Sequence, residues 1–211
     1  MLLGASGAGK STLLLALAGL LDPANAGEAE GSLTVDGLDP RDARDRIGLV
    51  LQDPETQLVM ARSGDDVAFG PENHAVPPKA IWPRVDAALA AVRFPYGRDR
   101  RTDWLSGGEQ QKLALARAWA LEPEVLFLDE PTANLDPGAT REVETIVGEI
   151  HASGTKIVMT THNLGQARRL GDEILFINAG RLAERAPVER FFAQPSTAEA
   201  ASFIKGELPW S

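Results

Sequence analysis

Short apolar runs alternate with longer stretches of mixed character along this chain of 211 residues. The runs end in polar or turn-forming residues, a pattern that predicts buried strands. The strands predicted in this way are Met1–Leu3, Ser32–Val35, Ile47–Leu51, Val125–Leu128, Lys156–Thr161 and Glu173–Asn178. Asp36-Gly37 and Ala179-Gly180 are typical of the tight turns that follow two of these strands.

Several stretches between the strands carry apolar residues at helical spacing and are bounded by residues that end helices. Ser11–Leu20 is apolar on nearly every side, which predicts a buried helix that ends at Gly19 and Asp22-Pro23. The other predicted helices are Lys79–Val92, Ser106–Leu121, Gly138–Ala152, Pro187–Ala193 and Thr197–Gly206. Strands that alternate with helices predict an α/β domain with a parallel sheet, whose ligands bind at the carboxyl ends of the strands.

Proline and glycine divide the part of the chain that follows Gln52. Asp53-Pro54, Gly70-Pro71 and Pro77-Pro78 separate its segments, and its main predicted helix is Lys79–Val92. We therefore expect a mainly helical lobe at about 54–113, inserted into an α/β core of about 1–53 and 114–193. A tail of about 194–211 completes a single domain.

Composition narrows the classes of protein to which the chain can belong. Hydrophobic residues make up 44% and charged residues 24%, which is ordinary for a globular domain. The net charge of −9 argues against a nucleic-acid partner, because the surface as a whole repels phosphate backbones. The absence of cysteine excludes disulfides, a thiol nucleophile and thiolate metal sites, and it suits a cytoplasmic protein.

Membrane and export signals are weak in this sequence. No stretch approaches the roughly 20 apolar residues that span a bilayer. The run Leu13–Leu21 followed by Ala24-Asn25-Ala26 resembles a secretory signal peptide with its cleavage site. We disfavour this alternative, because the only preceding positive side chain is Lys10 and cleavage would remove the motif described next.

A glycine-rich motif directly follows the first predicted strand. Gly4-Ala5-Ser6-Gly7-Ala8-Gly9-Lys10-Ser11-Thr12 fits the pattern G-x-x-x-x-G-K-[ST] of the phosphate-binding P-loop. Its glycines let consecutive backbone N–H groups converge on one anion, and the following helix adds the positive end of its dipole. Lys10 can reach the β- and γ-phosphates of a nucleotide, and the Ser11 hydroxyl can ligate Mg²⁺. The predicted phosphate-binding residues are Gly4, Ser6, Gly7, Gly9, Lys10, Ser11 and Thr12.

Polar residues at the ends of three other predicted strands complete the requirements of a nucleoside triphosphatase. Asp129 follows four apolar residues and fits the strand-end aspartate that holds Mg²⁺ through water. Glu130 beside it is placed to orient or deprotonate the attacking water. Gln52 and His162 also stand at carboxyl ends of predicted strands, the edge at which a parallel sheet binds its ligands.

Leu105-Ser106-Gly107-Gly108-Glu109-Gln110-Gln111 is the most specific motif of the chain. A serine and two glycines that open a helix make a second anion site, with exposed N–H groups and a helix dipole. Placed before the strand that ends in Asp129-Glu130, this motif resembles the signature of the ATP-binding-cassette ATPases. The resemblance covers essentially the whole chain. It implies a P-loop NTPase (RecA-like) parallel-sheet core with an inserted helical lobe, and an enzyme that binds ATP and Mg²⁺ and hydrolyses ATP.

The resemblance also implies a second ATPase subunit, either a second copy of this chain or a paralogue. In the family, the signature of one subunit completes the ATP site of another, head to tail. Ser106, Gly107 and Gly108 would therefore bind the γ-phosphate held by the P-loop of the second subunit. Asn134-Leu135-Asp136 resembles the D-loop, which runs along the seam between the subunits, and Asp136 is counted among the nucleotide-binding residues.

Three further positions match the family's catalytic motifs. Gln52 resembles the Q-loop glutamine, which touches Mg²⁺ or water, and His162 resembles the switch histidine, which donates to the γ-phosphate. Glu130 would then act on the attacking water, while Ser11 and Asp129 would hold the metal with Gln52.

Two kinds of importer compete as the nearer resemblance. Gln52–Leu58 and Asp65–Asn73 resemble energy-coupling-factor ATPases, which drive the uptake of cobalt, nickel or vitamins. Gly206–Trp210 is more similar to importers of tungstate, molybdate or phosphate, and we favour the first. Both imply transmembrane partner subunits and a place on the cytoplasmic face of the cell membrane.

Family members normally carry two antiparallel strands and an adenine-stacking aromatic residue before the P-loop. This sequence starts inside the P-loop strand, so we expect either a true start site upstream of Met1 or an N-terminally truncated relative in which those antiparallel strands are missing. A soluble ATPase of DNA repair or translation stays an alternative, disfavoured because the chain lacks long coiled-coil insertions and a second cassette. A degenerate, non-hydrolysing subunit is a further alternative, disfavoured by the presence of Lys10, Asp129, Glu130 and His162.

Overall fold

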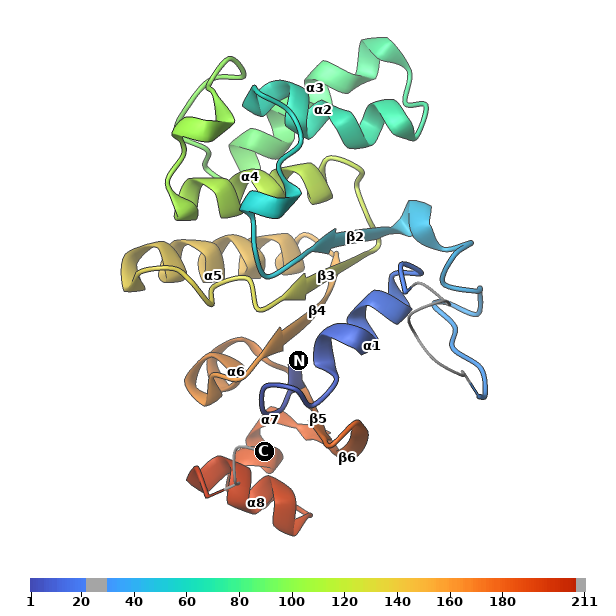
Figure 1. The fold of residues 1–211 in the computed structure, drawn as a ribbon, viewed down its shortest axis with the longest axis vertical. Helices are drawn as coiled ribbons and strands as arrows, with labels where there is room; N and C mark the ends of the chain where they lie inside the picture. Colours follow the sequence, from blue (N-terminus) through green and yellow to red (C-terminus); the bar gives the residue numbers. More distant parts are fainter. Residues whose placement is uncertain (22–29, 208–211) are drawn as a thin grey trace. The chain divides into compact units, whose positions relative to one another are not determined.

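The computed structural model describes residues 1–21 and 30–207, and these divide into two compact units. We call Met1–Pro40 together with Val158–Ser211 the P-loop unit, and Arg41–Ile157 the signature unit. Both are drawn in Figure 1. No helix of the described residues is long and apolar enough to cross a membrane.

A four-stranded sheet forms the centre of the P-loop unit. Its order is β4 (Lys156–Thr161, in this unit from Val158 onward), β1 (Leu2–Leu3), β5 (Glu173–Asn178) and β6 (Arg181–Pro187). The central strand β1 is parallel to both neighbours, with Leu2 opposite Thr160 on β4 and Leu175 on β5. β5 and β6 pair as an antiparallel hairpin with a bulge after Phe176. The loops that follow β1 and β4 therefore leave the sheet at the same edge.

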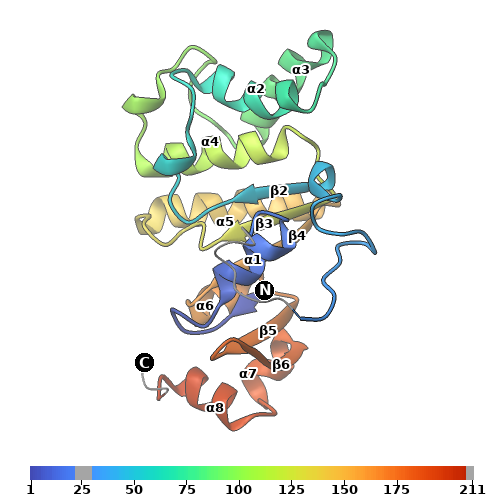
Figure 2. The same ribbon diagram turned by 45° about the vertical axis from the view of Figure 1, so that its right-hand side comes forward.

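Aromatic packing consolidates the P-loop unit. The helices α7 (Val188–Ala193) and α8 (Ala198–Lys205) lie beside the β5–β6 hairpin, and α6 (Leu164–Leu170) contacts α7 (Figure 2). The ring of Phe176 lies 5.8 Å from that of Phe191 and 5.1 Å from that of Phe203. Burial of each large apolar side chain contributes about 1.5–3 kcal/mol. The fully buried members of this core are Leu3, Ala167, Ile174, Phe176, Ala186, Phe191 and Ala200.

Two parallel strands and four helices form the signature unit. β2 (Ile47–Val50) pairs with β3 (Val125–Asp129), from Ile47 opposite Val125 to Val50 opposite Leu128. The helices are α2 (Ser63–Asn73), α3 (Pro78–Ala91), α4 (Gly107–Trp119) and α5 (Pro137–Ala152). α4 contacts α2 and α3 on one side and β2 and α5 on the other, as Figures 1 and 2 show. Such a position explains why α4 buries apolar residues around most of its surface.

Most predicted elements agree with the structure within a few residues, but one predicted strand is wrong. Ser32–Val35 forms no strand; it ends in an isolated bridge between Val35 and Leu38 around the Asp36-Gly37 turn. Leu33 is exposed, so the alternating pattern has no sheet or core to face among the described residues. The predicted helix end at Asp22-Pro23, the supposed cleavage site and the residues after Glu207 lie outside the described residues.

Three elements were not predicted: α2, α6 and β6. α2 contains Gly70-Pro71, a pair that predicts a break between segments, and α3 similarly contains Pro83. These prolines are tolerated because each helix packs on neighbours in the signature unit, which outweighs one lost hydrogen bond. Short 3-10 helices at Arg44–Arg46, Glu55–Gln57 and Thr102–Trp104 complete the connections.

Candidate active site

The glycines of the P-loop motif are required by the geometry of the P-loop unit. A Cβ on Gly4 would lie 2.2 Å from the Ile177 carbonyl oxygen of β5, so only glycine lets the chain leave β1 here. Gly7 and Gly9 have φ of 79° and 95°, the left-handed region that glycine adopts most easily. Gly9 is the N-cap of helix α1 (Lys10–Leu17), so the loop turns directly into a helix N-terminus.

Lys10 lies inside this loop rather than in solvent. Its Nζ donates to the carbonyl oxygens of Gly4 and Ala5, both at 3.0 Å, and the residue is only 5% exposed. Ser11 and Thr12 follow in the exposed first turn of α1, where N–H groups have no intrahelical acceptor. The P-loop and the start of α1 thus combine a buried ammonium, a helix N-terminus and two hydroxyls. These groups together suit the phosphates of a nucleotide.

His162 is brought to the same edge of the P-loop unit. β4 lies beside β1 with Thr161 opposite Leu3, so His162 and Gly4 are the first residues beyond two neighbouring strands. His162 is exposed, and the following Asn163 caps α6 by accepting from the Gln166 N–H at 3.0 Å. The predicted neighbourhood of P-loop and histidine therefore exists within this unit.

Asp129 and Glu130 end the corresponding strand of the signature unit. Asp129 is 5% exposed at the end of β3, and β2 runs beside β3 toward Gln52. Glu130 has φ of 43°, a left-handed conformation that costs a residue other than glycine about 1 kcal/mol or more. Strained backbone of this kind is concentrated at functional sites.

The oxygen donors predicted for Mg²⁺ are chemically suited to that ion. A serine hydroxyl, a glutamine amide oxygen and a carboxylate are hard ligands, from Ser11, Gln52 and Asp129 respectively. Mg²⁺ normally keeps several waters and takes only one or two carboxylates together with substrate phosphates. The described residues contain no cluster of three or more His, Cys, Asp or Glu side chains that could hold a metal ion.

The signature motif forms the N-terminus of α4. Ser106 is its N-cap, and a capping box joins Ser106 to Glu109: the Glu109 N–H donates to Ser106 Oγ at 3.4 Å, and the Ser106 N–H donates to Glu109 Oε2 at 2.8 Å. A Cβ on Gly108 would lie 2.9 Å from the Ala139 Cβ in the first turn of α5. The glycine therefore allows the start of α4 to approach the start of α5.

Asp136 has a structural task in the same region. Its Oδ1 accepts from the N–H groups of Gly138 and Ala139 at 2.8 and 3.2 Å, which makes it the N-cap of α5. The segment Asn134-Leu135-Asp136 thus approaches the signature through Leu135, whose Cδ2 would lie 3.9 Å from a Cβ on Gly107.

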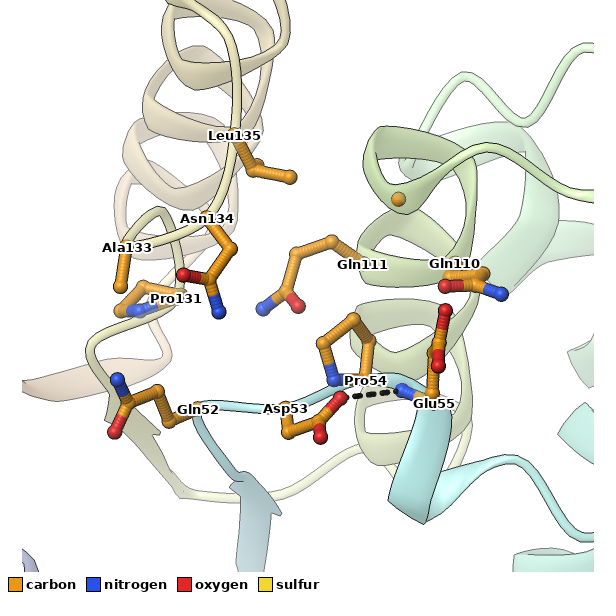
Figure 3. A pocket seen from close by; sticks show the side chains of 11 residues that line it. Gln52, Asp53, Pro54, Glu55, Gln110, Gln111, Pro131, Ala133, Asn134 and Leu135 are labelled. Atoms are coloured by element: carbon orange, nitrogen blue, oxygen red, sulfur yellow. Dashed lines mark hydrogen bonds between the residues drawn. The ribbon is translucent and has the colours of Figure 1, made fainter.

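A hollow of about 260 Å³ lies between these motifs of the signature unit (Figure 3). Its walls come from the segment after β2, the first turns of α4 and the segment after β3. Figure 3 shows Gln111 extending from α4 toward Asn134 and Pro54. Gln111 is 1% exposed, and its Nε2 has no hydrogen-bond partner among the described residues. The lining residues are Gln52, Asp53, Pro54, Glu55, Gly107, Gln110, Gln111, Pro131, Ala133, Asn134 and Leu135.

Buried polar side chains, for which the sequence predicted no role, fix the segment after β2. The side-chain amide of Gln57 forms three hydrogen bonds. Its Oε1 accepts from the Leu51 N–H at 2.9 Å, and its Nε2 donates to the carbonyl oxygens of Leu51 and Asp53, both at 3.0 Å. Arg117 of α4 donates to the Gln57 carbonyl and lies 3.7 Å from the fully buried Asp66 of α2. No signal in a single sequence distinguishes such buried polar side chains from the solvated face of a helix.

Comparisons with known proteins agree with this geometry. Residues 1–133 match the model of the ABC transporter family. The cobalt import ATP-binding protein CbiO of Rhodobacter capsulatus is 43% identical over 189 residues, which cover 88% of this chain and 67% of the relative. The energy-coupling factor transporter ATP-binding protein EcfA1 of Symbiobacterium thermophilum is 40% identical over 215 residues, 99% of this chain and 72% of the relative.

Among solved structures, cbiO1 of Clostridium perfringens, described as part of the ABC transporter complex cbiONQ, matches with a TM-score of 0.75. Its identity to this chain is 31%, over 99% of this chain and 84% of that one. The fold is thus that of a P-loop ATPase domain. The chain belongs to the ABC transporter family and is an ATP-binding ATPase, as the signature motif predicted.

Proposed function

We propose that this chain is the ATP-hydrolysing subunit of an importer of the energy-coupling-factor type, which takes up a metal ion or a vitamin. Its relatives in cobalt import and energy-coupling-factor transport support this, together with the glycine-built helix N-terminus found in each of the two units. The partners are a second ABC ATPase subunit and transmembrane subunits, which place the chain on the cytoplasmic face of the cell membrane. Residues 54–113 serve as the helical lobe.

The P-loop residues hold the triphosphate of ATP in this proposal. Lys10 offers its charge to the β- and γ-phosphates, and the backbone N–H groups around Gly7 and Gly9 surround them. Ser11, Gln52 and Asp129 bind Mg²⁺, which supplies charge stabilisation to the phosphoryl group when it is bound.

Glu130 orients the attacking water and takes its proton. His162 donates to the γ-phosphate, and the N-terminus of α4 in a second subunit, with Ser106, Gly107 and Gly108, binds the same phosphate from the other side. The two helix N-termini, one from each subunit, thereby stabilise negative charge on the same γ-phosphate.

The substitution Glu130→Gln tests this assignment. It keeps the shape of the side chain and removes the base, so we expect Mg·ATP binding to be retained, hydrolysis to stop and a nucleotide-bound dimer to accumulate. Lys10→Ala should lose nucleotide binding, and Glu189→Gln, the same chemical change on the exposed surface of α7, should leave all three properties unchanged. A Glu130→Gln protein that hydrolyses ATP as a monomer would refute the proposed mechanism.

A further inference from the structure

The signature helix carries a negative charge where the proposed function requires it to bind phosphate. Glu109 lies in the first turn of α4. A carboxylate at this end of a helix stabilises the helix dipole. It also repels an incoming phosphate, because unit charges of the same sign a few ångströms apart interact by about 1 kcal/mol even in water. For α4 to accept phosphate, hydrogen-bond donors or a positive side chain of this chain must offset the charge of Glu109.

Both oxygens of the Glu109 carboxylate have a donor from the chain. Oε2 accepts from the Ser106 N–H at 2.8 Å, and Oε1 accepts from the Tyr96 hydroxyl at 2.8 Å. Burial alone raises the pKa of Glu109, but these hydrogen bonds and the nearby charge of Arg100 lower it below its ordinary value. The carboxylate is therefore ionised at neutral pH and held against its own helix cap.

Arg100 differs from the other arginines of this loop. Arg98 and Arg101 form ion pairs with Asp86 and Asp103. The guanidinium of Arg100 instead stacks on the Tyr96 ring, 4.2 Å from its centroid.

Its Nη2 donates to the Trp104 carbonyl at 2.9 Å, directly before the signature. Across residues 1–21 and 30–207, no carboxylate forms an ion pair with Arg100, and its Nε has no acceptor. Its charge is thus available to offset Glu109 through the shared Tyr96.

We propose that Tyr96 and Arg100 are positioning residues of the signature, which hold Glu109 in the capping box and offset its charge so that the N-terminus of α4 accepts phosphate. The ligand is the γ-phosphate of a nucleotide bound to the P-loop of a second subunit, so this inference rests on the proposed function. Because they act on the signature alone, substitutions of Tyr96 and Arg100 should weaken pairing of the subunits and leave binding of ATP by a single subunit intact.

The experiment uses the Glu130→Gln protein as parent and measures dimerisation by sedimentation over a range of Mg·ATP concentrations. Arg100→Gln should weaken ATP-dependent dimerisation by about fivefold or more, the size of one partly exposed charge interaction. Tyr96→Phe, which keeps the ring under Arg100, should weaken it by about threefold or more through the lost hydrogen bond. Arg101→Gln removes the same charge from the same loop and should dimerise like the parent.

A double variant separates charge compensation from general support of the loop. When Glu109→Gln is added to Arg100→Gln, the charge that needs compensation is gone, and dimerisation should return to within about twofold of the parent. Parental dimerisation of Arg100→Gln, or a double variant no better than Arg100→Gln alone, would overturn the inference. A parent that stays monomeric with Mg·ATP would contradict pairing of two copies of this chain, which is a failure of the homodimer and is distinct from a failure of the contact between Tyr96 and Glu109.

A second measurement tests the inference even if the parent protein stays monomeric. Tyr96 is the only tyrosine of the chain, so the ultraviolet absorbance of its phenolate reports this hydroxyl alone. The hydrogen bond to Glu109 raises the pKa of Tyr96 above its ordinary value of about 10. Glu109→Gln should lower the midpoint of this titration, and an unchanged midpoint would show that the contact on which the inference depends does not form.

Discussion

Replacing Gly4 with alanine tests the packing that carries the P-loop. A Cβ at this position would lie 2.2 Å from the Ile177 carbonyl oxygen and 3.3 Å from its carbonyl carbon. Carbon atoms in contact normally lie about 3.5–4.0 Å apart, so both distances are too short. The obstacle is backbone, which cannot swing aside as a side chain does, and either β5 or the start of the loop must move.

The free-energy cost of Gly4→Ala depends on how firmly β5 is held in the sheet. It pairs with β1 on one side, with Phe176 opposite Leu3, and with β6 on the other. Forcing extra atoms into such a packed site costs about 1–3 kcal/mol, and we expect the upper end here. For a chain of this size, 1 kcal/mol changes Tm by about 2–4 °C, so Gly4→Ala should lower Tm by roughly 6–12 °C.

Thermal unfolding followed by circular dichroism, with and without Mg·ATP, measures this effect. Gly148→Ala is the matched control, because a Cβ there meets no atom within 4 Å and the residue lies inside α5. It should raise stability by about 1 kcal/mol through helix propensity. A Gly4→Ala protein that unfolds within about 2 °C of the original chain would refute the proposed packing.

Three further substitutions have defined outcomes. Glu184→Gln should cost about 2 kcal/mol at pH 7 in urea unfolding, because its carboxylate accepts hydrogen bonds from Ser196 and Thr197. Burial raises the pKa of Glu184, but these bonds lower it overall, so its stabilisation is full above about pH 4.3 and is lost as pH falls through the lowered pKa. A difference from the original chain that does not shrink as pH falls below about 4 contradicts this. Gln111→Leu should leave stability unchanged or raise it by about 1 kcal/mol, because it removes a buried Nε2 donor that has no acceptor. A loss above about 2 kcal/mol would refute this. Asp66→Ala should cost about 3 kcal/mol, because the Asp66 carboxylate accepts from the N–H groups of Val59 and Met60 and lies beside the Arg117 guanidinium; a cost below about 1 kcal/mol would contradict these contacts.

The sequence correctly predicted the elements whose ends are marked by polar or turn-forming residues. Lys156–Thr161 and Glu173–Asn178 are complete apolar runs that end in polar or turn residues, and both strands have the predicted bounds. α5 was predicted within one residue at its start, because its apolar face is regular and Gly154 follows its end with φ of 110°.

The missed elements depend on neighbours that a sequence does not reveal. β6 is rich in charged residues and becomes a strand because it pairs with β5 across the Ala179-Gly180 turn. α2 contains both glycine and proline, and it is helical because α3 and α4 pack against it. The motif residues could be found from the sequence, whereas the contacts of Tyr96 and Arg100 and the burial of Gln111 depend on the folded chain and could not.

The glycines of the two phosphate-type motifs are needed for different physical reasons, and one of them has no reason inside the described chain. Gly4 and Gly108 avoid collisions, at 2.2 and 2.9 Å respectively, while Gly7 and Gly9 adopt positive φ. Gly107 has neither constraint: it lacks a positive φ, and the nearest atom to a Cβ would be 3.9 Å away, an ordinary contact. Gly107 is the first residue of α4, and we propose that its missing side chain leaves room for a group from outside the chain to approach the N–H groups at the start of this helix. A phosphate bound from a second subunit is such a group.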